Sequence, residues 1–111
     1  MNNAIFKGKS IGLISSYWRS LPPPLSDTME LYIDFLDVSA NHRRQGIAEK
    51  LIEITVDKAI EEKVYQVRSW RSEDKLEAIP MWQSLGFGLC PTTTYPGGNE
   101  VNGFFVVKRL Q

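Results

Sequence analysis

The chain has 111 residues, which is enough for a single core, and we expect one domain over residues 1–111. Its 13 basic and 13 acidic residues cancel, so no overall charge attracts nucleic acid or an anionic membrane, and neither partner is expected. One cysteine excludes an internal disulfide framework, and one histidine with one cysteine cannot form a metal site. No apolar run approaches the ~20 residues that span a bilayer. We therefore expect a cytoplasmic protein without a membrane segment.

The first third of the chain predicts strands. Residues 4–6 and 10–18 alternate as two strands, and Lys7-Gly8-Lys9 between them predicts a hairpin. The run Leu21-Pro22-Pro23-Pro24-Leu25 lacks three consecutive backbone donors and predicts a stiff loop.

Residues 30–38 predict the next strand, because apolar and polar residues alternate along it. Leu31, Ile33 and Phe35 are expected to face the core. The opposite face holds Glu30, Tyr32, Asp34, Leu36 and Val38, and this face is polar enough to line a cleft.

A helix is predicted over residues 46–62 by one continuous apolar stripe, which consists of Ile47, Ala48, Leu51, Ile52, Thr55, Val56, Ala59 and Ile60. Residues 64–70 predict a strand. A second helix is expected from Ser72 as N-cap to Gly86 at its end, with a kink at Pro80.

The last strands are expected at residues 87–89 and 104–109, with a turn-rich loop over 91–103 between them. The strand, helix and strand from Leu31 to Trp70 imply one parallel pair, whereas the hairpins imply antiparallel pairs. The predicted fold class is therefore α/β, with a mixed, mostly antiparallel central sheet.

Residues 38–48, Val-Ser-Ala-Asn-His-Arg-Arg-Gln-Gly-Ile-Ala, join a strand to the start of a long helix. The amides from Arg44 to Ala48 and the positive end of the helix dipole favour an anion, and Arg43 and Arg44 add charge. Gly46 allows a ligand to come close. Too few glycines are present for a dinucleotide fingerprint or a Walker loop.

This segment resembles the pyrophosphate-binding motif Gln/Arg-x-x-Gly-x-Gly/Ala of the GNAT superfamily, the acyl-CoA-dependent N-acyltransferases. A second signature agrees: Ala78, Trp82 and then Gly86-Phe87 resemble the family's Ala…Tyr…Gly-Phe junction between a helix and a strand. The resemblance covers roughly residues 3–110. Family members usually begin with a strand and two helices that this chain does not have, so it resembles a short member with a reduced N-terminal part.

The resemblance implies that acetyl-CoA is the cosubstrate, held in part by backbone around residues 36–38. The alternative for the arginine-rich turn is a simple helix cap. For Lys75 and Trp82, the alternatives are a surface lysine and a core residue. The residues that the resemblance assigns to acetyl-CoA are Leu36, Asp37, Val38, Arg43, Arg44, Gln45, Gly46, Ile47, Ala48, Lys75 and Trp82.

Acyl transfer to an amine requires a base that deprotonates the ammonium, and the departing thiolate benefits from an acid. Asp34 is favoured as base over Glu30, although both fit ordinary sheet residues. Tyr32 occupies the position of a glutamate base in some family members, and a phenol with a pKa near ~10 is a poor base. Trp82 stands where the family commonly has an acidic tyrosine, so the acid would be water or Tyr32.

These observations predict an N-acetyltransferase that moves an acetyl group from acetyl-CoA to a primary amine of a small molecule or protein by direct attack. The alternative is a non-catalytic acyl-CoA-binding or protein-interaction module on the same fold. We also expect a homodimer in which a neighbour completes the acceptor cleft, with Phe104-Phe105-Val106-Val107 as one candidate contact.

Overall fold

A single mixed sheet forms the frame of the protein in the computed structural model, which describes residues 2–6, 9–39 and 46–111. Its six strands lie in the order β1-β2-β3-β4-β6-β5. β3 and β4 are parallel and the other described neighbours are antiparallel, as the sequence predicts. The strands are β1 (Asn2–Phe6), β2 (Lys9–Ser20), β3 (Met29–Val38), β4 (Gln66–Ser72), β5 (Gly88–Thr94) and β6 (Val101–Arg109).

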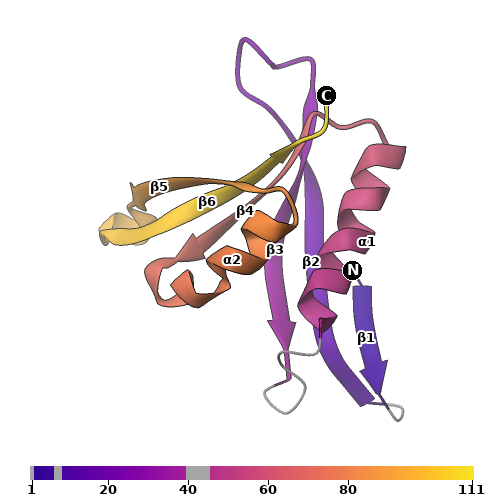
Figure 1. Ribbon diagram of the computed structural model, residues 1–111. Helices are drawn as coiled ribbons and strands as arrows, with labels where there is room; N and C mark the ends of the chain where they lie inside the picture. The colour runs from indigo at the N-terminus through magenta and orange to yellow at the C-terminus, as the bar shows by residue number, and fades with distance from the viewer. Residues whose placement is uncertain (1, 7–8, 40–45) are drawn as a thin grey trace.

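Both α-helices cover the same face of this sheet (Figure 1). They are α1 (Ile47–Glu61) and α2 (Ile79–Ser84), and two 3-10 segments, η2 (Glu73–Ala78) and η3 (Pro96–Gly98), complete the elements. Side chains from α1, α2 and the inner face of the sheet form one buried cluster, which includes Leu51, Val56, Trp82 and Val106. Among the described residues, no helix is both long and apolar enough to cross a bilayer.

The α1 stripe is narrower than its sequence predicts. Leu51, Ile52, Thr55, Val56 and Ala59 are buried. Ile60 is 55% exposed, because it lies about 100° around the helix from Ala59 and leaves the buried side. The prediction of Ile60 as a core residue was wrong.

A β-bulge in β3 changes which side chains reach the core. Ser15 pairs with Phe35 and the next residue, Ser16, pairs with Ile33, so Asp34 is the extra residue on β3. The insertion reverses the alternation beyond it: Phe35 turns to the helix-free face and is 47% exposed, whereas Val38 is 8% exposed. The sequence-based assignment of Phe35 to the core and Val38 to the polar face was therefore wrong.

Two other predictions fail at prolines. Pro80 lies in the first turn of α2 because the preceding segment is the separate 3-10 helix η2, so it breaks no helix interior. Pro91 lies within β5, an edge strand where a missing donor is tolerated. The predicted loop over 91–103 is thus mostly a longer hairpin of β5 and β6, with its turn near η3.

The parallel ladder that joins the two halves of the sheet is short. It contains four residue pairs, from Glu30–Gln66 to Ile33–Ser69. Beyond them β3 and β4 continue in different directions (Figure 1). Ser69 Oγ donates a 2.8 Å hydrogen bond to the Ile33 carbonyl at the end of the ladder.

A buried carboxylate reinforces this ladder at its other end. Glu30 is 1% exposed. Arg68 donates to its two oxygens at 2.8 and 2.7 Å, and Gln66 donates at 2.9 Å. Burial raises the pKa of Glu30, but the hydrogen bonds from Arg68 and Gln66 and the charges of Arg68 and Arg19 outweigh it, so the pKa is lowered overall.

Replacing Glu30 with glutamine leaves the half-buried Arg68 without its counter-charge, so we expect the free energy of unfolding at neutral pH to fall by about 2–3 kcal/mol. Because the lowered pKa of Glu30 stabilises the fold above its unfolded-state pKa, this contribution disappears as the pH falls from that value through the folded-state pKa. Denaturant titrations at neutral and acidic pH measure both effects. The matched control is Glu53→Gln on the exposed side of α1; an equal loss in both variants would contradict the account.

Candidate functional site

The start of α1 has the geometry of an anion site. Its N-cap, Gly46, adopts φ 76° in the left-handed region that glycine favours, and no side chain of the described residues caps the helix. A Cβ placed on Gly46 would meet nothing within 4 Å among the described atoms. The first amides of a helix have no acceptor within the helix, so Ile47 and Ala48 present donors at a positively polarised end.

The diverging end of β3 lies at the same end of the sheet. Figure 1 shows α1 beginning beside the arrowhead of β3. Along this end of β3, Leu36 is half-buried, Asp37 is exposed and Val38 is buried. Six of the residues assigned to acetyl-CoA therefore gather in one region: Leu36, Asp37, Val38, Gly46, Ile47 and Ala48.

The remaining residues assigned to acetyl-CoA are placed differently. Arg43, Arg44 and Gln45 lie outside the described residues. The backbone of Lys75 belongs to η2. Trp82 is fully buried, with its ring 4.9 Å from that of Phe87 in an edge contact and with the Arg71 guanidinium 5.9 Å from its centroid.

Trp82 carries a buried polar atom that needs explanation. Its Nε1 is shielded from solvent and has no hydrogen-bond acceptor within the described part of the chain. An unsatisfied buried donor costs roughly 1–3 kcal/mol. The donor lies on α2, at the position where the sequence resemblance places a ligand contact.

Glu30 is poorly suited to act as a base. Both of its oxygens accept hydrogen bonds from Arg68, and its pKa is lowered. A carboxylate held in this way has little affinity for a further proton near neutral pH. The structure gives Glu30 a role in joining β3 to β4.

Tyr32 remains a protonated phenol at neutral pH. Its pKa is raised, chiefly by burial, although the neighbouring Arg68 and Arg19 oppose the shift. The guanidinium carbons of Arg19 on β2 and Arg68 on β4 each lie 5.1 Å from its ring centroid. A phenol in this state can donate a hydrogen bond but is a weak base.

Asp34 has the geometry that suits a base best among the three predicted residues. It is exposed and forms the bulge at which β3 leaves β4. A carboxylate in this position can accept a proton directly or through water. Its catalytic role stays a prediction.

Sequence reasoning missed the cations that surround these groups. Arg68 contacts Glu30, Tyr32 and Phe105, and Arg19 lies over Tyr32. The alternation Gln66, Arg68, Trp70 along β4 was a usable signal, because it places these side chains on the face opposite Val67 and Ser69.

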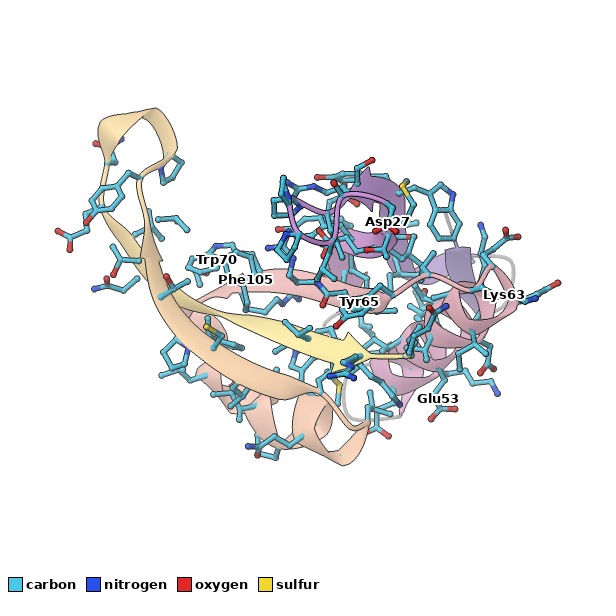
Figure 2. All side chains as sticks on the ribbon, turned by 90° about the horizontal axis from the view of Figure 1, so that it is seen from above. Asp27, Glu53, Lys63, Tyr65, Trp70 and Phe105 are labelled. Atoms are coloured by element: carbon cyan, nitrogen blue, oxygen red, sulfur yellow. The ribbon has the colours of Figure 1, made fainter. Side chains whose placement is uncertain are left out.

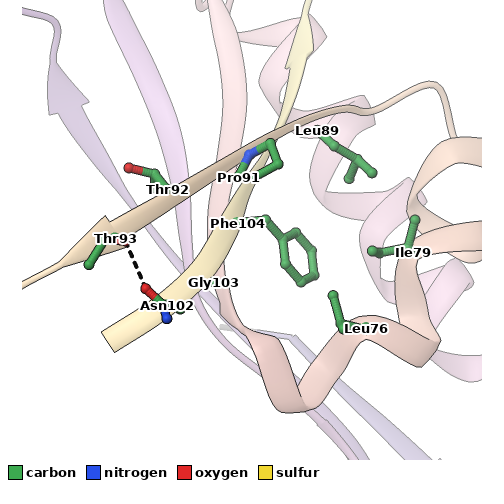
Figure 3. A pocket seen from close by; sticks show the side chains of 9 residues that line it. All are labelled: Leu76, Ile79, Leu89, Pro91, Thr92, Thr93, Asn102, Gly103 and Phe104. Atoms are coloured by element: carbon green, nitrogen blue, oxygen red, sulfur yellow. Dashed lines mark hydrogen bonds between the residues drawn. The ribbon is translucent and has the colours of Figure 1, made fainter. Parts of the chain in front are cut away.

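A hollow of the described structure lies elsewhere. It has a volume of about 490 Å³ and lies between η2 and the β5–β6 hairpin, lined by Leu76, Ile79 and Phe104 among others (Figure 3). At its edge Thr93 donates a 2.7 Å hydrogen bond to Asn102. Among the side chains that the structure describes, none that lines it is titratable, so these residues offer no acid or base.

Solved structures with the same fold include N-acetyltransferases. Chaetomium thermophilum Naa20 in complex with a bisubstrate analogue has a TM-score of 0.81 at 21% identity, with 97% of this chain and 64% of that chain covered. The NatC complex bound to Gag peptide and CoA has a TM-score of 0.77 at 24% identity, with 92% of this chain and 62% of that chain covered. Arabidopsis thaliana Naa50 in complex with the bisubstrate analogue CoA-Ac-MVNAL has a TM-score of 0.75 at 21% identity, with 96% of this chain and 70% of that chain covered.

The chain thus spans less than two thirds of the length of the first two of these proteins. No curated protein sequence matches it. A model of the acetyltransferase (GNAT) family matches residues 3–87, which is most of the chain. This match contains the diverging strands, the open start of α1 and Trp82, and the chain therefore belongs to the GNAT family of acetyltransferases.

Proposed function

We propose that this protein transfers an acetyl group from acetyl-CoA to a primary amine. One observation carries the proposal: the start of α1 at Gly46, which no described side chain caps, lies at the same end of the sheet as the divergence of β3 from β4. Membership of the GNAT family and the CoA and bisubstrate ligands named for three similar structures support it.

Some of the chain's own groups bind the cosubstrate, and others transfer protons. The first-turn amides of α1 bind the pyrophosphate, and the backbone of β3 beyond Asp34 orients the thioester. Asp34 accepts the proton that the acceptor ammonium must lose before attack. The neutral amine nitrogen then forms a bond to the acetyl carbon, the bond between that carbon and sulfur breaks, and the nitrogen releases its second proton to water as the amide forms.

Protonation of the departing thiolate is the step for which this chain is least equipped. The indole of Trp82 donates a hydrogen bond but does not release a proton at accessible pH. Tyr32 keeps its proton at neutral pH and lies on β3 near the divergence. We propose that water or Tyr32 supplies this proton.

The burial of Trp82 also supports a second candidate function, that of a non-catalytic acyl-CoA-binding module. Such a module needs the binding groups at Gly46 and along β3 but no acid. It would bind acetyl-CoA and release no thiol above background in the presence of amines.

We also propose that the protein is cytoplasmic and acts as a homodimer. The dimer is supported by the face of the sheet that carries neither α1 nor α2. Of the strand segment suggested as a contact, Phe104 and Val106 are buried in the core cluster. Phe105 and Val107 alternate with them and point to the other face.

A matched pair of substitutions at Gly46 tests the anion site. Asparagine and aspartate have nearly the same size and both tolerate a positive φ, but only aspartate adds a negative charge. We expect Gly46→Asn to bind acetyl-CoA within a few-fold of wild type and Gly46→Asp to bind it at least about tenfold more weakly by calorimetry, a difference of about 1.4 kcal/mol. Equal affinities would show that no phosphate lies at this helix end.

A second pair tests proton transfer at residue 82. Trp82→Tyr and Trp82→Phe introduce rings of the same size, and only the phenol can release a proton. With an amine that supports turnover, we expect the tyrosine variant to release thiol about tenfold faster than the phenylalanine variant, since acid catalysis contributes about 10²–10⁴-fold. Equal rates in two folded variants would exclude residue 82 from proton transfer. No thiol release by any variant, with acetyl-CoA binding intact, would favour the binding module.

A further inference from the structure

Trp70 lies where the sheet begins to open. The parallel ladder between β3 and β4 ends at the pair Ile33–Ser69, so Trp70 is the first residue of β4 beyond it. Trp70 pairs with Phe105 of β6. Figure 2 shows both residues on the side of the sheet away from the helices. The indole therefore lies on the helix-free face, beside the start of the divergence.

The groups proposed to transfer protons lie on the same face of β3. Asp34 is exposed and follows Ile33, whose side chain belongs to the core cluster, and successive side chains of a strand point to opposite faces. Burial is the main influence on the pKa of Tyr32, and a hydrogen bond with the Trp70 backbone is a further one. The predicted base and the Trp70 ring thus stand on the two strands that flank the opening.

Gly103 on β6 makes room for the Trp70 ring. A Cβ on Gly103 would lie only 2.6 and 2.8 Å from two ring carbons of Trp70, and it would also collide with the Arg71 carbonyl. A glycine inside a strand often marks such a close approach. Phe105 contacts the indole edge to face, with centroids 5.1 Å apart. The ring is therefore held in position by its neighbours within the sheet.

The surface around the ring is mainly aromatic. Phe35 is 47% exposed beside Asp34. The Arg68 guanidinium lies 4.6 Å from the centroid of Phe105, but its charge is paired with Glu30 at 2.7 Å. Asp34 thus offers an exposed carboxylate to an ammonium, and the neighbouring rings offer an apolar surface. A second charge placed on such a surface loses hydration, whereas an apolar group gains from leaving water.

We propose that Trp70 is a specificity-determining residue whose indole packs on a bulky apolar group that the acceptor carries close to its amine. The proposal rests on the acetyltransferase function proposed above. Neighbouring strands lie about 4.8 Å apart where the ladder ends, so a group one or two carbons from the nitrogen reaches the indole while the amine stays at Asp34. Small arylalkylamines and peptides that begin with a large apolar residue share this chemistry.

Two pairs of acceptors, each differing in the apolar group, test this role. One pair is phenethylamine and ethylamine, and the other is the tripeptide amides Leu-Ala-Gly and Gly-Ala-Gly. From the rate of thiol release, we expect wild type to have a kcat/KM at least about tenfold higher for the apolar member of the pair that it acetylates. The pair with the higher kcat/KM distinguishes a small amine from a peptide as the acceptor.

Substitution of Trp70 should remove this preference. We expect Trp70→Ala to lower kcat/KM at least about tenfold for the apolar member and to change it less than about twofold for the small member. Trp70→Thr, with a β-branched side chain that suits a strand, serves if the alanine variant unfolds.

The matched control is Trp18→Ala. Trp18 is 40% exposed on β2, and its ring lies 5.9 Å from Lys58 Nζ of α1, so it belongs to the side of the sheet that the helices cover. This variant should keep the preference of wild type. Circular dichroism confirms that each variant is folded.

Three outcomes would overturn the role of Trp70 and leave acetyl transfer standing. The first is an equal kcat/KM within each pair for wild type. The second is an equal loss for both members in Trp70→Ala, since the residue would then act in the reaction or the fold and not in selection. The third is a preference for 1,4-diaminobutane over phenethylamine, which would show that the rings bind a second cation.

The absence of thiol release with all of these amines would count against acetyl transfer, and a binding measurement then decides the role of Trp70 separately. Calorimetry of the protein saturated with CoA compares phenethylamine with ethylamine. Binding of phenethylamine at least about tenfold tighter in wild type, and lost in Trp70→Ala, would support the role. Equal binding of the two amines, or no binding, would overturn it.

Discussion

The ion pair between the Glu30 carboxylate and Arg68 is the interaction on which the rest of this structure depends. The sheet consists of an antiparallel half, β1 to β3, and a second antiparallel half, β4 to β6, and a ladder of four residue pairs joins them. Glu30 strengthens this short junction by accepting hydrogen bonds from Arg68 and Gln66 across it. Because the side chain is buried, these bonds are shielded from water, and loss of either charged partner leaves the other exposed to a large desolvation penalty.

The ladder between β3 and β4 is held firmly at the Glu30 end, and the two strands diverge at the other end. The ladder ends at Ile33 and Ser69, and the bulge at Asp34 follows at once on β3. Bulges bend a strand and end its pairing, which is why they occur next to functional sites. Here the bend leads β3 toward the start of α1, where Gly46 leaves the first-turn amides open. The two elements that carry the proposed binding groups thereby meet at one end of the sheet.

The fold class and the glycine at the start of α1 could be predicted from the sequence because both depend on local patterns. The apolar stripe of α1 and the glycine at its start are visible in the residues themselves, and the structure confirms the parallel pair that they imply. Phe35 could not be assigned correctly, since a one-residue insertion in the strand pairing leaves no trace in an alternating sequence. The network of Glu30 with Arg68 and Gln66 was also inaccessible, because Gln66 and Arg68 lie 36 and 38 residues from Glu30 in the chain.

Hydrogen exchange of the protein with and without acetyl-CoA is the most direct test of the central claim, that the diverging end of β3 and the start of α1 form one binding site. The account predicts that acetyl-CoA slows amide exchange in residues 34–38 and in the first turn of α1, and leaves the β5–β6 hairpin unchanged. Protection confined to the hollow beside that hairpin, or no protection in either segment at saturating ligand, would contradict it.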